Sequence, residues 1–325
     1  MEKDRIVNSM GKKFYKKFFE TLEEKWMIYF LVIVIIGIFV IGIYSFGVKP
    51  LIYDIIDFEN PHLEKAIEES LNSLNISKQE AEDVKKLSIN SVNGFSNLND
   101  LEAFQNLEEL EITECSLTSL DGIENLKKLK VLNCSDNNIS DISALYDSNL
   151  GLISIDLSKN NISDIYRIAS YLPELEILNV AECELTGEID FGENTNLKSI
   201  NISSNCVSKI FGVLPNLEII SCTNNDIENI SQFLTFSKLK ELRLSNNEML
   251  KSIEGLSTLE NLELISIEKT GIENIDELKK VKKLNSIYID GAIDRDQIDF
   301  IIDNFKTGDT ATKQYVLKNK YEFLD

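Results

Sequence analysis

The residues with the greatest capacity for chemistry in this sequence are its single histidine, its five cysteines and its 54 acidic side chains. His62 has no partner at the spacing of zinc ligands, since the patterns H-E-x-x-H and C-x-x-C are both absent. The G-x-S-x-G, Walker A and G-x-G-x-x-G motifs of hydrolases and nucleotide-binding proteins are absent as well. We therefore expect no enzyme activity, no metal site and no cofactor, and we expect His62 to be a surface residue.

The acidic side chains determine the charge of the molecule. The formal net charge is −21, and the sequence pI is about 4.6. A field of this sign repels a phosphate backbone, so nucleic acid is excluded as a partner. Basic residues outnumber acidic ones near the N-terminus, where residues 1–25 contain seven lysine and arginine residues against five acidic ones.

A long apolar segment follows this basic tail. No residue from Trp26 to Val48 is charged, and the segment is long enough to cross a hydrocarbon core of about 30 Å as one helix. A cleaved signal peptide is the alternative, but its apolar stretch has only about 7–15 residues and ends at a small-residue cleavage site, which is lacking here. The sequence therefore predicts an uncleaved transmembrane helix over residues 26–48, in contact with the lipid bilayer.

The charges on either side of this helix predict its orientation. Seven basic residues precede it, whereas only Lys49 and Lys65 lie in the twenty residues after it. The positive-inside rule then keeps residues 1–25 in the cytoplasm. We expect a single-pass protein of the cell membrane, in which a linker of residues 49–57 leads to an extracytoplasmic domain.

The domain beyond the linker is repetitive. In the segment LKVLNCSDNNISDISAL, which runs from Leu129 to Leu145, apolar residues fall at offsets 0, 3, 5, 10, 13 and 16. One such coil cannot bury its apolar face alone, so stacked coils must share a core. About ten units recur between residues 84 and 291, and they start at Val84, Leu107, Leu129, Leu152, Leu175, Leu197, Leu217, Leu239, Leu262 and Leu284.

The pattern L-x-x-L-x-L-x-x-N-x-L in these units resembles the leucine-rich-repeat family. The resemblance implies an α/β fold, a solenoid with a curved parallel sheet inside and short helices or turns on the convex side. Residues 58–83 precede it as two short helices, with Asn60 and Pro61 at one start and the capping box Ser77-x-x-Glu80 at the other. This cap resembles that of internalin-like bacterial proteins, although their L-P-x-T-G sorting signal is missing here. Residues 292–325 are expected to form a C-terminal cap, with a lid helix, and a tail.

Offset 8 of each repeat carries a residue that we interpret as structural. An inward amide can satisfy the backbone N–H and C=O groups that lose their ladder partners where the chain leaves the strand. The family also allows cysteine or threonine at this position. The column consists of Cys115, Asn137, Asn160, Cys183, Asn205, Asn225, Asn247 and Thr270.

The same register indicates that the cysteines do not pair. Cys115 and Cys183 share offset 8 but lie three coils apart, and Cys134 and Cys222 share offset 5 four coils apart. At about 4.8 Å per coil these separations exceed the limit of about 7 Å between bridged Cα atoms. Cys206 lies one coil from Cys183, but offsets 8 and 9 face opposite ways. We expect five free thiols, with Cys134 and Cys222 in the core.

Ligands of this family usually meet the concave sheet, which here presents offsets 2, 4, 6 and 7. Its N-terminal half is acidic, which favours a cationic or polar partner, while Arg243 and Lys269 interrupt the acidic strip toward the other end. The alternative is a solvated face that only keeps the solenoid soluble, with binding on a flank or cap. The candidate binding residues are Glu109, Glu111, Glu114, Asn133, Asp136, Asp156, Asn179, Glu182, Asn201, Ser221, Arg243, Ser266, Lys269 and Tyr288.

These features predict a non-catalytic, membrane-anchored leucine-rich-repeat protein that binds a protein or a cell-envelope polymer outside the cell. A second hypothesis makes the chain a structural or signalling accessory subunit of a membrane complex, which meets its partner through the transmembrane helix. Dependence of the association on residues 1–48, as opposed to the concave face, would distinguish the second hypothesis from the first.

Overall fold

The structure is a computed structural model that describes residues 54–146, 150–290, 295–304 and 314–317. The chain divides into two compact units, residues 1–54 and 55–325. The predicted cytoplasmic tail and the predicted transmembrane helix over residues 26–48 lie outside the described residues. In the part of the chain that is described, no helix is long and apolar enough to cross a membrane.

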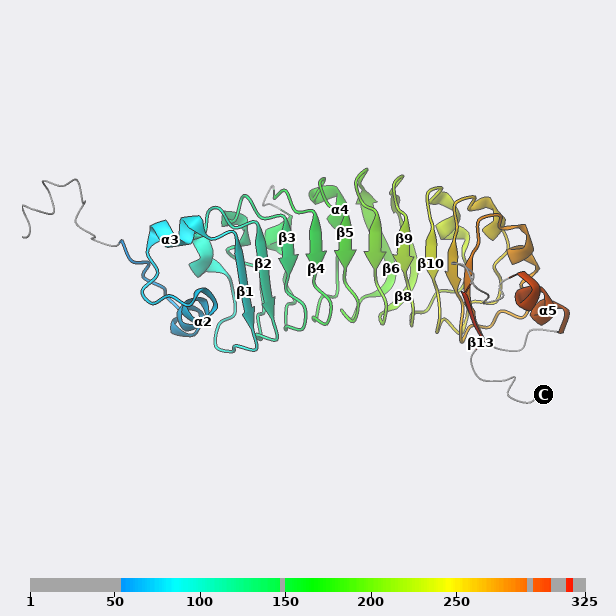
Figure 1. The fold of residues 1–325 in the computed structure, drawn as a ribbon, viewed down its shortest axis with the longest axis horizontal. Helices are drawn as coiled ribbons and strands as arrows, with labels where there is room; N and C mark the ends of the chain where they lie inside the picture. The colour runs from blue at the N-terminus through cyan, green and yellow to red at the C-terminus, as the bar shows by residue number, and fades with distance from the viewer. Residues whose placement is uncertain (1–53, 147–149, 291–294, 305–313, 318–325) are drawn as a thin grey trace, which may run out of the picture. The chain divides into compact units, whose positions relative to one another are not determined.

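The second unit contains the parallel sheet that the repeats predict. Ten strands, one from each unit, lie side by side in chain order (Figure 1), and corresponding residues of neighbouring coils are paired. Each strand begins two residues after the start of its repeat. The strands are β1 Lys86–Asn90, β2 Glu109–Thr113, β3 Val131–Asn133, β4 Ser154–Asp156, β5 Ile177–Asn179, β7 Ser199–Asn201, β9 Ile219–Ser221, β10 Glu241–Arg243, β11 Leu264–Ser266 and β12 Ser286–Ile289.

The core lies between this sheet and the convex connections. In the coil that starts at Leu129, the strand side contributes Leu132 and Cys134, and the convex side contributes Ile139 and Leu145, none of which is more than 1% exposed. A shift of one residue would turn the apolar side chains of the strand outward, so burial fixes the register. The leucine-rich-repeat solenoid expected from the sequence is confirmed.

Most of the convex connections are single helical turns. Most of them carry the apolar residue at or near offset 16 into the core, as Leu145 does, and the apolar residue near offset 13 lies just before the turn. These turns are η1 Asn99–Ala103, η2 Ile123–Asn125, η3 Ser143–Leu145, α4 Ile168–Tyr171, η4 Ser231–Thr235, η5 Leu256–Thr258 and η6 Asp276–Lys280.

Two neighbouring coils lack the short helix or turn that was expected on the convex side, so the prediction was wrong for these two coils. Their convex connections are the strands β6, Thr186–Glu193, and β8, Cys206–Val213, which form a separate two-stranded parallel sheet. In β6 the buried residues Ile189 and Phe191 alternate with Asp190, a period of two that suits a strand. In β8 the register changes near the end, so Val213 at offset 16 is 59% exposed and Leu214 enters the core instead.

The N-terminal helices lie where their capping residues predict them. In α2, Pro61–Leu71, Asn60 Oδ1 accepts hydrogen bonds from the N–H groups of His62 (2.9 Å) and Leu63 (3.2 Å). In α3, Lys78–Asp83, Ser77 and Glu80 form the reciprocal capping box, and these hydrogen bonds lower the pKa of Glu80. The cap packs its apolar residues onto the first coil. His62 itself is exposed, as expected.

The C-terminal end is closed by a helix and an additional strand. Helix α5, Arg295–Asn304, falls in the segment expected to form a lid, and its Ile301 is buried in the core. Strand β13, Gln314–Leu317, pairs in parallel with β12 and extends the main sheet by one strand. No repeat pattern predicts β13.

Candidate functional site

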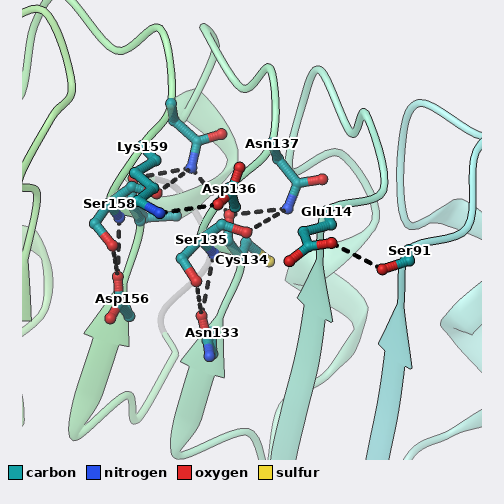
Figure 2. A network of polar contacts seen from close by, with 12 residues as sticks. Ser91, Glu114, Asn133, Cys134, Ser135, Asp136, Asn137, Asp156, Ser158 and Lys159 are labelled. Atoms are coloured by element: carbon teal, nitrogen blue, oxygen red, sulfur yellow. Dashed lines mark hydrogen bonds and ion pairs between the residues drawn. The ribbon is translucent and has the colours of Figure 1, made fainter.

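The candidate binding face is held in shape by the residues at offset 8. The Oδ1 of Asn137, a residue drawn in Figure 2, accepts hydrogen bonds from the N–H groups of Cys115 and Leu117 in the preceding coil, both at 3.0 Å. Its Nδ2 donates to the carbonyls of Ile112 (2.7 Å) and Cys134 (3.0 Å). The corresponding asparagines, Asn160, Asn205, Asn225 and Asn247, are also buried, and each donates to a carbonyl of the preceding coil. The Oδ1 of Asn205 likewise accepts from two N–H groups of that coil, and the Oδ1 atoms of the other three accept from one.

The cysteines at offset 8 replace only part of this network. The Cys183 thiol donates to the carbonyl of Leu157 at 3.1 Å, and the Cys115 thiol lies near the carbonyl of Ile89 at 3.6 Å. Each of these carbonyls is at offset 5 of the preceding coil, the position to which an asparagine at offset 8 donates. A thiol cannot supply the strong acceptor of an amide oxygen. Thr270 donates only to Ile267, within its own coil, at 2.8 Å.

Residues at offset 7, shortly after the end of each strand, adopt the left-handed backbone conformation. The φ angles of Glu114, Asp136 and Glu182 are 55°, 58° and 55°, and that of Lys159 is 56°. L-residues adopt this conformation at a cost of about 1 kcal/mol, which the surrounding hydrogen bonds must offset. The backbone therefore fixes the direction in which these charged side chains leave the face.

All five cysteines are free thiols, and four of them are buried. Cys134 and Cys222 are fully enclosed, as the register predicts, and burial raises the pKa of both thiols far above the usual value. Burial also raises the pKa of Cys183 to about 12. Cys206 lies at the start of β8 and is exposed.

We expect iodoacetamide at pH 8 to modify only Cys206 while the chain is folded. A raised pKa keeps the buried thiols protonated at this pH, and the reagent attacks the thiolate. Peptide mass spectrometry would measure the labelling at each cysteine before and after addition of guanidinium chloride, which is expected to expose the other four. Rapid labelling of Cys134 without denaturant would contradict the burial of offset 5.

The structure brings the candidate residues of offset 4 together in one row. The register pairs Glu111 with Asn133, Asn133 with Asp156, and Asp156 with Asn179, and the row continues to Tyr288. Ser266 is the exception in accessibility. It is only 8% exposed, and its hydroxyl is hydrogen-bonded to that of Ser245, so it offers little surface.

Five of the six acidic candidates, all except Glu182, fall into two groups by their contacts. Glu109 is paired with Lys86 at 2.6 Å, and Asp136 is paired with Lys159 at 3.1 Å, so an internal cation offsets their charge. Asp136 also raises the pKa of Lys159 through this contact.

The second group of acids is oriented by neutral donors. Glu111 accepts a hydrogen bond from the Ser88 hydroxyl at 2.9 Å, and Glu114 accepts one from Ser91 at 2.8 Å (Figure 2). Asp156 accepts hydrogen bonds from Asn179 Nδ2 at 2.8 Å and from the Ser158 hydroxyl. These contacts fix the carboxylates without neutralising them.

At the other end of the face, the candidate residue Arg243 is already in an ion pair. The Arg243 guanidinium lies 2.7 Å from Glu241 within the same strand, with both side chains partly exposed. Tyr288 is half-buried. Lys269 is exposed at offset 7 and has the left-handed φ of that column, 52°.

The sequence interpretation missed two apolar features of the surface. One is formed by Val131, Ile153 and Ile177, which lie where strands β3, β4 and β5 begin and are all exposed. The signal was present, because offsets 1 and 2 point outward and apolar residues there cannot reach the core. The other is a groove of about 470 Å³ on the convex side, beside β8, with Phe211 and Val213 in its wall.

Comparison with known proteins agrees with this geometry. The family described as Leucine Rich repeats (2 copies) matches residues 105–147. The sequence of this chain matches no curated protein. The solved structure of Listeria monocytogenes InlP is 24% identical over 74% of this chain and 73% of its own, with a TM-score of 0.61.

Two further structures extend the comparison. An internalin from Listeria monocytogenes, InlF, is 21% identical over 81% of this chain and 91% of its own, with a TM-score of 0.57. A chain of the LRIM1/APL1C complex is 18% identical over 65% of this chain and 50% of its own, with a TM-score of 0.50. At these identities the likeness concerns the fold.

The matched repeats, the parallel sheet and the ladder of inward asparagines together define the fold as a leucine-rich-repeat solenoid. Its fold is similar to that of the internalin structures, and two capping helices precede the first strand.

Proposed function

We propose that this chain is a non-catalytic binding protein, anchored in the cell membrane by residues 26–48, whose extracytoplasmic solenoid binds a protein or an envelope polymer on its concave face. The observation that carries the proposal is the row of outward-facing, at least partly exposed polar side chains at offset 4 of the sheet, from which only Ser266 is withdrawn. Neighbouring coils hold these side chains in fixed positions through hydrogen bonds, as for Glu111 and Asp156. A face organised in advance loses little conformational entropy on binding.

The charge of the face supports a cationic partner. Strands β2 to β5 and the residues that follow them carry six carboxylates at the outward offsets and a single lysine; the carboxylates are Glu109, Glu111, Glu114, Asp136, Asp156 and Glu182. Opposite charges accelerate the encounter of two proteins and select among partners. The LRIM1/APL1C complex also supports protein binding as a use of this fold.

The membrane anchor is tested by protease protection on intact cells. The chain carries one tag at Met1 and another after Asp325. Because seven basic residues precede the apolar segment, we expect protease to remove the C-terminal tag and to spare the N-terminal one. Loss of the N-terminal tag alone would reverse the proposed topology.

The binding face is tested by photo-cross-linking of the full-length chain in its own cells. A photo-reactive amino acid replaces Asn201 in the concave row or Glu254, an exposed residue of a convex connection. We expect a partner adduct from Asn201 and none from Glu254. Adducts from Glu254 alone would contradict the concave face, and adducts only from positions within residues 26–48 would favour the accessory-subunit hypothesis.

A further inference from the structure

The exposed apolar residues at the edge of the concave face form one patch. Val131 and Ile153 are 37% exposed and Ile177 is 46% exposed, although all three lie beside a well-filled core. They come from three successive coils. The register pairs Val131 with Ser154 and Ser154 with Ile177, and the N–H of Ile177 donates to the carbonyl of Ile153 at 3.1 Å. At about 4.8 Å between strands, the three side chains share one small area.

The apolar patch interrupts a ladder of charges. At offset 1, just before the strands, neighbouring coils form ion pairs between Lys85 and Glu108 (2.9 Å), Glu176 and Lys198 (2.8 Å), and Glu218 and Lys240 (2.8 Å). Ile153 occupies this offset in the coil between Lys130 and Glu176. An isolated exposed apolar side chain is ordinary, but three adjacent ones in a charged rim mark a contact surface.

Uncompensated acid lies at offset 4, two positions beyond offset 2, on the strands beside those of Val131 and Ile177. Glu111 is in β2, next to β3, and Asp156 is in β4, between β3 and β5. The contacts that orient these carboxylates come from the neutral groups of Ser88, Ser158 and Asn179. Residues two apart on a strand lie on the same face, separated by about 7 Å. An apolar surface and a negative surface therefore follow one another along the strand direction.

We propose that the partner of this face is a protein segment in extended conformation that carries an apolar residue followed, two positions later, by lysine or arginine. The apolar side chain covers the patch of Val131, Ile153 and Ile177, and the cation reaches Glu111 or Asp156. This inference rests on the proposed function and specifies its partner. A second copy of this chain does not fit, because its formal net charge of −21 would repel an acidic face.

The test uses a labelled peptide as probe and the full-length chain in nanodiscs of zwitterionic lipid. The peptide has three Leu-Ser-Arg-Ser units, and two matched peptides carry serine in place of every leucine or of every arginine. Fluorescence anisotropy measures the affinity, with empty nanodiscs as the blank. We expect the parent peptide to bind at least about tenfold more tightly than either matched peptide.

Variants of the chain assign the two contacts. Val131→Thr combined with Ile177→Thr keeps β-branched residues in the strands and removes two of the three apolar side chains of the patch. We expect it to reduce affinity for the parent peptide to that of the leucine-free peptide. Val213→Thr, a similar change at an exposed residue of β8, is the control and is expected to have no effect.

Glu111→Gln combined with Asp156→Asn is expected to reduce affinity for the parent peptide to that of the arginine-free peptide and to remove most of the salt dependence of binding.

The inference is overturned if the leucine-free peptide binds as tightly as the parent, if the double threonine variant binds the parent unchanged, or if the parent does not bind. Cross-links from Asn201 with no peptide binding would reject this partner chemistry and leave the proposed function standing. Absence of both would reject both.

Discussion

Replacement of Leu132 or Ile155 by aspartate is expected to unfold the solenoid. Both side chains are at most 1% exposed. They are register partners on the neighbouring strands β3 and β4, and both point into the core. A carboxylate placed there has no cation or donor to compensate its loss of water, which costs on the order of 5 kcal/mol. That is comparable with the whole stability of a domain, roughly 5–15 kcal/mol. Circular dichroism and protease resistance of the purified chain would measure the loss of structure.

Two variants on the outer side of the sheet serve as controls. Glu111→Ala removes an exposed carboxylate from β2, and Ile177→Asp makes the same type of change as Ile155→Asp at a residue that is 46% exposed. Both are expected to remain folded, with unfolding midpoints close to that of the natural chain. Equal stability of all the variants would refute the assignment of inward and outward residues.

Replacement of Asn137 by alanine is expected to destabilise the solenoid by about 3 kcal/mol or more, since each buried backbone group left without a partner costs about 1–3 kcal/mol. The variant would leave the N–H groups of Cys115 and Leu117 without their acceptor and the carbonyl of Ile112 without its donor. We expect a lower midpoint in urea-induced unfolding, followed by circular dichroism.

The matched control is Asn138→Ala in the next position. Asn138 is exposed, and its contact to Leu117 is made by its backbone N–H, which alanine retains. The free energy of unfolding of this variant is expected to stay within about 0.5 kcal/mol of that of the natural chain. Similar midpoints for the two alanine variants would show that the Asn137 amide is not needed to hold the coil.

The regular part of the fold could be predicted because one physical rule operates in every coil. Leu132 and Ile155 each have to point inward, and the spacing of such residues sets both the period and the register. The same rule places Asn137, Asn160 and Cys134. The capping residues Asn60, Ser77 and Glu80 act locally, so their helices could also be predicted from the sequence alone.

The irregular parts depend on contacts between coils that a single repeat does not specify. Strands β6 and β8 form because two neighbouring connections can pair with each other, and only the alternation around Ile189 and Phe191 indicated it. Strand β13 needs the free edge of β12.

For the candidate site, the sequence predicted which residues share the concave row but could not give their contacts. Glu109 and Arg243 are already in ion pairs within the solenoid, whereas Glu111 is hydrogen-bonded to the neutral hydroxyl of Ser88. The patch of Val131, Ile153 and Ile177 was missed because apolar residues were assigned to the core by default.

The asparagine ladder also gives the solenoid a direction. Asn137, Asn160, Asn205, Asn225 and Asn247 each accept hydrogen bonds from N–H groups of the coil before their own. A coil of this kind therefore has its polar groups satisfied only after the next one has been made. On the ribosome, folding should trail synthesis by at least one repeat. A chain that stops early would end in a coil whose backbone N–H groups still lack their asparagine acceptor.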